Sequence, residues 1–189
     1  MISHVKLSAH TKEEYYKTPE GARLELVDGA FHDMAAPSRY HQKILVWLLQ
    51  RIGRHIEEKG LACEIYCAPF DVELFEAEDT VVQPDISVIC DPSKLTEHGC
   101  TGAPDFIVEI ASPSDVRHDY LTKANLYARA GVREYWIVDP MRQMTVVYSF
   151  SGDGESDEVK VYPFTGDAVP VGICEDFAVD FKEIAENEE

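Results

Sequence analysis

At residues 105–114 the chain reads DFIVEIASPS, the pattern of a buried strand that stops before a proline. With a period of two, the side chains of Phe106, Val108 and Ile110 share one face, and that of Glu109 lies on the other. Both faces are otherwise apolar, which predicts a central strand that is covered on both sides. A carboxylate there needs a partner or a cation, because burying it alone is very costly. Glu109 is therefore the strongest sign of chemistry in the sequence.

Apolar segments on either side of this strand predict its neighbours. A second strand is expected at residues 85–90, a helix at 115–130 and a further strand at 134–138. Strand, helix and strand in this order are typical of a βαβ unit with parallel strands. The helix carries Asp119 and Lys123 at i, i+4 spacing, which by itself predicts only a surface ion pair. The buried face of this helix is predicted to consist of Leu121, Ala124, Tyr127 and Ala128.

The N-terminal part contains a hairpin pattern. Residues 23–27 and 30–34 alternate like two strands around the turn signal Asp28-Gly29. Glu25 shares a strand face with Arg23, so a cross-strand ion pair on a solvated surface is the simplest explanation of this acid.

The next segment predicts a helix, a second hairpin and a loop. Ser38 is a suitable N-cap for a long helix that runs to about Lys59 and ends at Gly60. His41 in its first turn is more typical of a structural group than of a catalytic one. Residues 61–66 and 70–75 are expected to pair as a hairpin around a proline. Residues 94–104 are expected to form a loop.

Length and composition predict one α/β domain. The 189 residues are 45% hydrophobic, enough for one sizeable core, so a single domain is expected over residues 1–189. Its core is expected at about 11–150, with a peripheral β-hairpin and an acidic C-terminal tail over 151–189. The strands of this hairpin are expected at residues 145–150 and 158–162. No apolar run approaches membrane length and the N-terminus lacks the pattern of a signal peptide, so a cytoplasmic protein is expected. The five cysteines are spaced irregularly and are expected to be reduced.

The charge weighs against a general nucleic-acid binder. The formal net charge is −18, and residues 153–189 contribute 12 acidic and 2 basic side chains to it. An acidic protein repels the phosphate backbone, but a local basic face is still compatible with this balance.

The predicted sheet brings candidate catalytic groups together. Asp85 opens one strand, Glu109 lies in the next long one, and Lys123 follows in the helix. Two carboxylates at one end of a sheet suit a hard divalent cation such as Mg²⁺. A nearby lysine could orient a water molecule and offset charge on a phosphoryl oxygen. These parts suit phosphodiester hydrolysis.

The ordered motifs resemble the putative restriction endonuclease family of the PD-(D/E)XK nuclease superfamily. The resemblance covers about residues 11–150 and rests on segments that match in order. These are Glu25-Leu26-Val27-Asp28-Gly29, His41, Pro84-Asp85, Val108-Glu109-Ile110-Ala111-Ser112-Pro113-Ser114, Asp119, Lys123, Tyr127 and the run from Gly131 to Pro140. The family implies a restriction-endonuclease-like fold, with a mixed central β-sheet flanked by helices.

The resemblance also implies a set of metal ligands. Asp85 and Glu109 would be the metal-binding carboxylates of the superfamily motif, and the Ile110 carbonyl a further ligand. Glu25 would be an additional acid from an N-terminal element. The implied cofactor is Mg²⁺ or Mn²⁺.

The basic residue of the motif departs from the superfamily pattern. Two residues after Glu109 the chain has Ala111 where a lysine is expected. The resemblance therefore nominates Lys123 on the following helix, with Asp119 to hold it in place. His41 and Tyr127 would contact the ligands or the substrate.

The sequence thus predicts a metal-dependent endonuclease that cleaves DNA, with Asp85, Glu109, Glu25 and Lys123 as its catalytic groups. Two alternatives remain at this point. One is a non-catalytic dimeric binding or regulatory module that keeps the nuclease fold, which the acidity favours. The other is a hydrolase of a smaller phosphoester. The family analogy also allows a homodimer, since cutting two strands is easiest with two sites.

Overall fold

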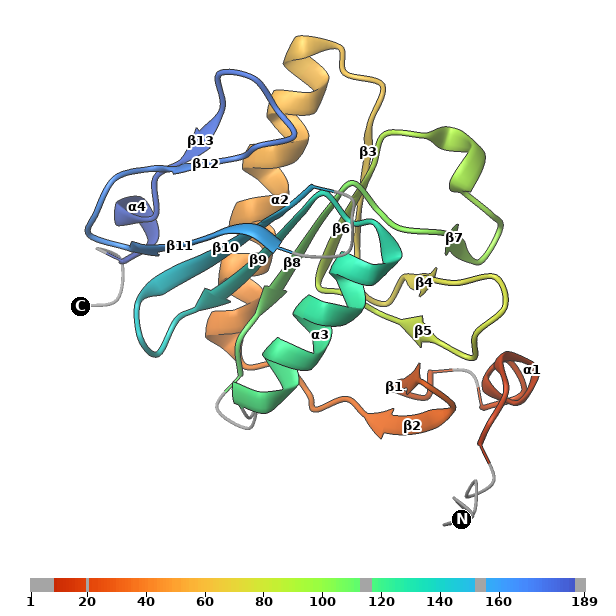
Figure 1. The fold of residues 1–189 in the computed structure, drawn as a ribbon. Coiled ribbons are helices and arrows are strands. Elements are labelled where there is room, and N and C mark those ends of the chain that lie inside the picture. The colour runs from red at the N-terminus through yellow and green to blue at the C-terminus, as the bar shows by residue number, and fades with distance from the viewer. Residues whose placement is uncertain (1–8, 20, 113–116, 152–155, 186–189) are drawn as a thin grey trace.

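The structure is a computed structural model, and it describes residues 9–19, 21–112, 117–151 and 156–185 (Figure 1). It is a mixed α/β fold, as the sequence predicts, but the described strands form two larger sheets and a two-stranded one in place of a single central sheet. The described helices are α1 (Lys12–Tyr15), α2 (Arg39–Lys59), α3 (Arg117–Ala130) and α4 (Lys182–Ala185), with a 3₁₀ turn at Pro92–Lys94. None of these helices has the length and apolarity that a membrane-spanning segment requires.

The larger sheet has six strands in the order β11-β10-β9-β8-β6-β3. Its strands are β3 (Glu64–Cys67), β6 (Ile86–Ile89), β8 (Phe106–Ile110), β9 (Glu134–Asp139), β10 (Met144–Phe150) and β11 (Ser156–Pro163). Strands β8 and β9 are parallel and are connected through α3, which confirms the predicted βαβ unit. The other pairs are antiparallel, including the predicted hairpin of β10 and β11.

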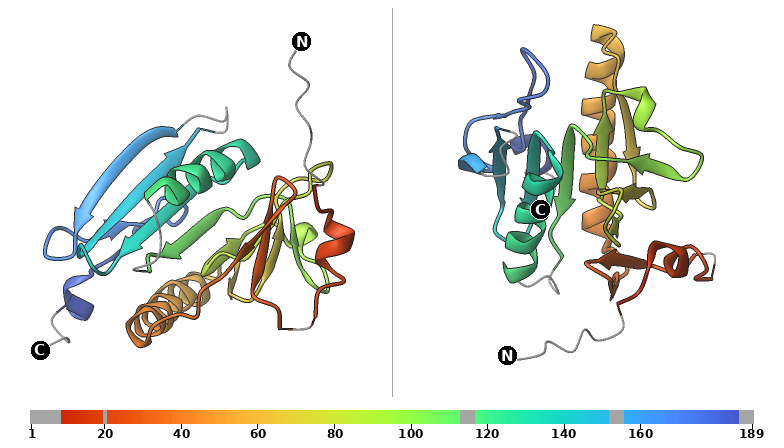
Figure 2. Two further views of the ribbon diagram at one scale, coloured as in Figure 1. Left: turned by 90° about the horizontal axis from the view of Figure 1, so that it is seen from below. Right: turned by 45° about the vertical axis from the view of Figure 1, so that its right-hand side comes forward.

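The smaller sheet has five strands in the order β2-β1-β5-β4-β7. Its strands are β1 (Leu24–Val27), β2 (Ala30–Asp33), β4 (Asp71–Glu73), β5 (Val81–Val82) and β7 (Gly99–Thr101). The predicted hairpin of β1 and β2 is confirmed, with Asp28 and Gly29 at positive φ in the turn. In Figure 2 this sheet stands beside the larger one, with α1 on its outer side.

Two local predictions in this region are wrong. The strands expected to form a hairpin around Pro69 separate, because β3 pairs with β6 in the larger sheet and β4 pairs with β5 and β7 in the smaller one. The expected loop at 94–104 contains β7, which runs parallel to β4. Gly99 permits this close pairing, because a Cβ there would collide with the Asp71 carbonyl. Both differences arise from partners that are distant in sequence.

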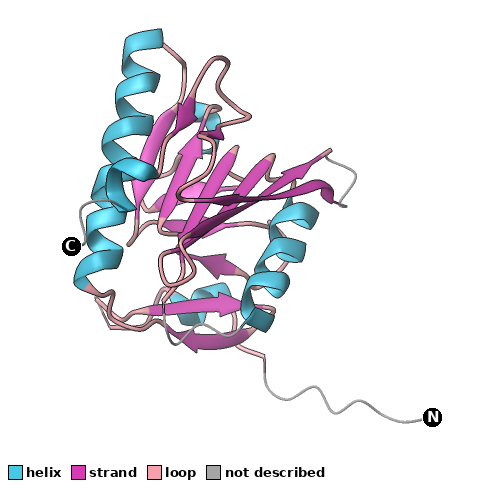
Figure 3. Ribbon diagram, turned by 90° about the vertical axis from the view of Figure 1, so that its left-hand side faces the viewer, coloured by secondary structure: helices cyan, strands magenta, loops and turns pink. Residues whose placement is uncertain are grey.

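Helices α2 and α3 lie on opposite faces of the larger sheet (Figure 3). Phe106, Val108 and Ile110 pack in the core that includes α2, and Ile107 packs in the core that includes α3. The two-sided cover of β8 is therefore confirmed. Leu121 is 52% exposed, so its predicted place on the buried face of α3 is wrong. Helical spacing gives the direction of a side chain but not how far the sheet extends beneath it.

Helix α2 begins and ends as its sequence predicts. The Ser38 hydroxyl accepts a hydrogen bond from the His41 backbone N–H, and Gly60 ends the helix in the left-handed region with φ 60°. These caps place the first turn of α2, and His41 with it, beside the end of the larger sheet.

The C-terminal segment contributes to the core beside α2. It contains β12 (Val169–Pro170), β13 (Ala178–Val179) and α4, and the Phe181 and Ile184 side chains are buried in that core. The acidic composition of residues 182–189 predicts a frayed end, but residues 182–185 form α4, so this prediction is wrong for those four residues. Residues 186–189 lie outside the described part.

A disulfide joins Cys63 to Cys90. Glu64 pairs with Ile89 in the β3–β6 ladder, so the two cysteines face each other one residue beyond it. The prediction of five reduced cysteines is wrong at these two positions, because irregular spacing in the sequence does not reveal a cross-strand contact. Cys67, Cys100 and Cys174 are free thiols.

Candidate functional site

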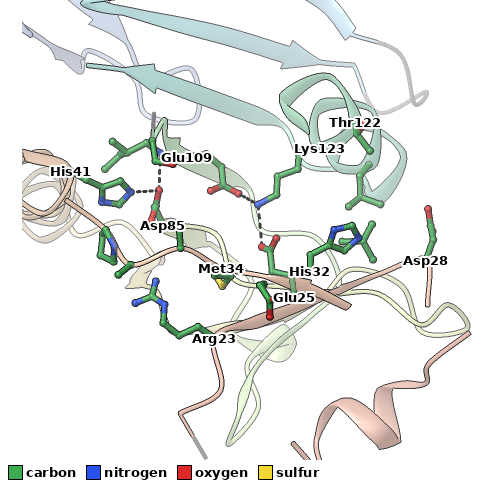
Figure 4. A pocket seen from close by; sticks show the side chains of 18 residues that line it. Arg23, Glu25, Asp28, His32, Met34, His41, Asp85, Glu109, Thr122 and Lys123 are labelled. Carbon is green, nitrogen blue, oxygen red and sulfur yellow. Dashed lines mark hydrogen bonds and ion pairs between the residues drawn. The ribbon is translucent and has the colours of Figure 1, made fainter. Parts of the chain in front are cut away.

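A cavity of about 510 Å³ opens where the two sheets, α2 and α3 meet, and it gathers the predicted site residues (Figure 4). Glu25, His41, Asp85, Glu109 and Lys123 all line it. They come from β1, the first turn of α2, the residue before β6, β8 and α3, in that order. Long-range folding therefore brings together the groups that are scattered over almost 100 positions of the sequence.

Asp85 and Glu109 stand opposite each other on neighbouring strands. Ile86 pairs with Val108 in the β6–β8 ladder, so the antiparallel register places Asp85 beside Glu109. Asp85 Oδ2 accepts a hydrogen bond from the Ile110 backbone N–H at 2.7 Å, and it lies 3.1 Å from His41 Nε2. His41 thus belongs to the site, although its place in a helix stripe favoured a structural role.

Lys123 connects the two sheets. Its ammonium donates to Glu109 Oε1 at 2.8 Å and to Glu25 Oε1 at 3.1 Å. The Tyr127 hydroxyl, one helical turn further along α3, donates to the same Glu109 oxygen at 2.9 Å. Lys123 therefore makes cross-sheet ion pairs that its i, i+4 spacing from Asp119 did not indicate. Asp119 is in α3, but its side chain lies outside the described residues.

Glu25 is buried, with 5% of its surface exposed, so the predicted cross-strand ion pair on a solvated face is wrong. Its second contact is to a residue that the sequence reading missed. The Gln83 backbone N–H donates to Glu25 Oε1 at 3.0 Å, and the Gln83 amide is held in turn by Asp71 and Tyr15. The only signal for Gln83 in the sequence is its place directly before the Pro84-Asp85 step.

Each of the three carboxylates has one oxygen held by the protein and a second without a partner among the described residues. Asp85 is held through Oδ2, and Glu109 and Glu25 are held through Oε1. The remaining oxygens are Asp85 Oδ1, Glu109 Oε2 and Glu25 Oε2. The fixed oxygens orient the carboxylates and leave three acceptors for a ligand in the cavity.

The charges in the cavity are out of balance, with three carboxylates around one ammonium. The pKa of the Glu109 carboxyl is raised to about 7. Burial is the main cause and Lys123 opposes it, while the negative charges of Asp85 and Glu25 add to the increase. Burial opposes the charge on Lys123, but Glu109 and Glu25 outweigh it and raise the pKa of its ammonium. Burial also raises the pKa of Tyr127, which keeps its hydroxyl a donor. A cation would relieve the excess of negative charge.

The donor set fits a hard divalent cation in its chemistry. Mg²⁺ and Mn²⁺ prefer oxygen ligands, and all three partnerless acceptors are carboxylate oxygens. As they stand, no three His, Cys, Asp or Glu side chains in the described ranges converge closely enough to enclose a metal. The Lys123 ammonium occupies the position between Glu25 and Glu109 instead. Asp85 and Glu109 are thus the pair best placed to bind a metal.

Comparison with known proteins agrees with the fold and the ordered motifs. A family model described as "Uma2: Putative restriction endonuclease" matches residues 12–178. This chain belongs to the Uma2 family. The match includes Glu25, Asp85, Glu109 and Lys123, so all four groups lie within the part of the chain that defines the family.

Two individual proteins are similar to this Uma2 chain over most of its length. An uncharacterized protein of Synechocystis, slr1290, is 29% identical over 161 residues, which are 82% of this chain and 83% of the relative. A crystal structure described as a putative nuclease belonging to DUF820, from Anabaena variabilis, superposes with a TM-score of 0.77 at 22% identity. The superposition covers 93% of this chain and 97% of that one, and it establishes the shared fold.

Proposed function

We propose that this Uma2-family protein is a metal-dependent endonuclease that hydrolyses phosphodiester bonds in DNA. The observation that carries the proposal is the pairing of Asp85 with Glu109 at the cavity, next to an ammonium 2.8 Å from Glu109. Two oriented carboxylates with free oxygens and a fixed cation suit a reaction in which negative charge develops on a phosphoryl group.

Asp85 and Glu109 would hold Mg²⁺ or Mn²⁺ through their partnerless oxygens, with Glu25 as a third donor. When bound, the metal polarises the phosphate and lowers the pKa of a bound water. Neither the cation nor its ligand geometry is part of the structure, so the roles that follow concern the protein groups.

Lys123 is suited to two tasks. Its ammonium is charged and has three donors, of which Glu109 and Glu25 engage two. The third can hold a water molecule or a phosphoryl oxygen in the cavity. The Tyr127 hydroxyl and the His41 ring keep Glu109 and Asp85 in position, which fixes their free oxygens toward the substrate.

A non-catalytic module is the second candidate, and one observation favours it. Lys123 already links Glu25 with Glu109, so these groups also stabilise the junction of the two sheets. Under this alternative, removing the carboxylates would change stability but no activity.

Metal titration followed by plasmid cleavage tests the proposal. Mn²⁺ is titrated into the wild type and into Asp85→Ala/Glu109→Ala, and each protein is then incubated with supercoiled plasmid and Mg²⁺ or Mn²⁺. Glu97→Ala is the matched control, since Glu97 is an exposed acid that does not line the cavity. We expect binding and nicking in the wild type and in the control, and neither in the double variant.

The other outcomes separate the alternatives. Binding without nicking of plasmid, but with hydrolysis of a model phosphodiester, would assign a small phosphoester substrate. The absence of Mn²⁺ binding by the wild type at millimolar metal would support the non-catalytic module. Nicking that the double variant retains would overturn the assignment of the site.

A further inference from the structure

The cavity has a wall that the proposed chemistry does not use. Arg23 lies two residues before Glu25 in the first hairpin, and both residues line the cavity. In the view of Figure 4, Arg23 is on the side below Asp85, opposite Lys123. The backbone beneath it is fixed, because the Arg23 carbonyl accepts a hydrogen bond from the Met34 N–H at 2.9 Å. A guanidinium therefore stands on a rigid hairpin at the entrance to the carboxylates.

Arg23 differs from half of the eight arginines of this acidic chain. Arg51, Arg129, Arg133 and Arg142 all pair with carboxylates. The exposed side chain of Arg23 makes no hydrogen bond or ion pair with any residue in the described ranges. With a net charge of −18, acidic side chains are abundant, so an unpaired guanidinium at a cavity is not explained by a lack of partners. Its five donors are available to a ligand.

Arg39 lies near this wall along the chain but is not among the residues that line the cavity. The wall continues from the hairpin through Ala35, Ala36 and Pro37, and Arg39 follows as the first residue of α2. Arg39 is also exposed and has no partner among the described residues. Of these two, Arg23 is thus the free guanidinium that lines the cavity, whereas Asp28 and Arg129 form an ion pair at the tip of the hairpin.

We infer that Arg23 binds a backbone phosphate of the substrate next to the scissile one. The planar fork of an arginine matches two phosphate oxygens, and it is the geometry that proteins use for phosphate contacts. The inference rests on the proposed function and adds the direction in which a polynucleotide crosses the site. Arg23 also adds positive charge to a cavity that is lined by Glu25, Asp33, Asp85 and Glu109.

Binding and nicking by Arg23 variants test this inference separately from the proposed function. A fluorescent 20-base-pair duplex is titrated with each protein in Ca²⁺, which neutralises the carboxylates, over a series of salt concentrations. The proteins are the wild type, Arg23→Ala, Arg23→Lys and Arg54→Ala. Arg54 is the matched control, because it is an exposed arginine on α2, about 22 Å along the helix from its first residue, Arg39.

We expect Arg23→Ala to weaken binding about tenfold and to lower the slope of log K against log salt by about 0.9, the value for one lost phosphate contact on duplex DNA. Arg23→Lys is expected to keep the slope and to recover part of the affinity. In nicking assays KM should rise with little change in kcat, since a phosphate beside the scissile one is bound equally before and during the reaction. Arg54→Ala should match the wild type.

The contrary results are distinct. Equal affinity and salt slope in the wild type and Arg23→Ala would overturn the role of Arg23 and leave the nuclease proposal standing. A lower salt slope for Arg23→Ala, combined with a wild type that nicks no plasmid, would overturn the nuclease proposal and keep the phosphate contact of Arg23. A wild type that binds no duplex at low salt would overturn both.

Discussion

Lys123 Nζ lies 2.8 Å from Glu109 Oε1, so a lysine on helix α3 reaches the carboxylate of the central strand β8. The strand itself has Ala111 two residues after Glu109, where the resemblance led us to expect a lysine. The structure thus supplies the cation from the crossover helix. The same ammonium also reaches Glu25, which makes Lys123 the link between the two sheets.

The raised pKa of Glu109 predicts a pH dependence of stability in the metal-free protein. The carboxyl has an ordinary pKa of 4.5 and a folded-state pKa of about 7, so the folded chain holds the proton more tightly than the unfolded chain. Its contribution to stability is full below 4.5 and is lost as the pH rises through 7. We expect the unfolding free energy of the wild type to fall between about pH 5 and about pH 8, and Glu109→Gln to show a smaller fall.

Urea unfolding in EDTA across this pH range measures the effect. The comparison of the two proteins cancels the contributions of other titrating groups. Identical pH profiles for the wild type and Glu109→Gln would contradict a raised pKa of the buried Glu109 carboxyl.

Replacing Lys123 by methionine should separate catalysis from metal binding. The variant leaves Glu25 and Glu109 without their cation, and we expect a loss of about 2 kcal/mol in unfolding free energy, since the side chain is 22% exposed. Nicking should be lost. Mn²⁺ should bind at least as tightly as in the wild type, because no ammonium competes for the carboxylates.

Calorimetric titration with Mn²⁺ gives the metal affinity, and Lys123→Arg is the control that retains a positive charge. If Lys123→Met lost Mn²⁺ binding while remaining folded, the lysine would be needed to build the metal site and the competition would be excluded.

Removing the Tyr127 hydroxyl tests how Glu109 is oriented. Tyr127 is fully buried and donates to Glu109 Oε1 at 2.9 Å. We expect Tyr127→Phe to cost about 1–2 kcal/mol of stability, because a buried acceptor loses a donor. Nicking should fall about tenfold, as expected for a contact that orients a metal ligand.

Thermal unfolding and plasmid nicking measure both effects. Tyr16→Phe is the control, since its hydroxyl contacts Glu73 on an exposed surface away from the cavity. An unchanged nicking rate in Tyr127→Phe would show that Lys123 alone orients Glu109.

His41 should act through Asp85. Because its ring holds Asp85 Oδ2 at 3.1 Å, we expect His41→Asn to weaken Mn²⁺ binding by about 10- to 100-fold, the usual effect of losing a partner of a metal ligand. His55→Asn is the matched control, a buried histidine on the same helix that stacks on Phe177 outside the cavity. The measurement is Mn²⁺ titration of both variants. If His41→Asn bound Mn²⁺ as tightly as the wild type and His55→Asn do, His41 would have a purely structural role.

Local patterns predicted much of the fold because they report local physical chemistry. The alternation in β8, the caps of α2 at Ser38 and Gly60 and the turn at Asp28-Gly29 each depend on neighbours within a few residues. All three were confirmed. The separation of β3 from β4 was not predictable in this way, because each strand finds its partners far along the chain.

For the candidate site, too, local sequence features determined some properties and long-range packing determined the others. The sequence by itself determined that Glu109 is a carboxylate in an apolar strand and must meet a donor or a cation. The resemblance added Asp85, Glu25 and Lys123 as further residues of the same site. Only the tertiary structure decided which contacts form. It turned Glu25 from a surface acid into a buried partner of Lys123, and it brought His41 to Asp85. The physical reason is that burial and hydrogen bonds across sheets depend on three-dimensional packing, which no single segment encodes.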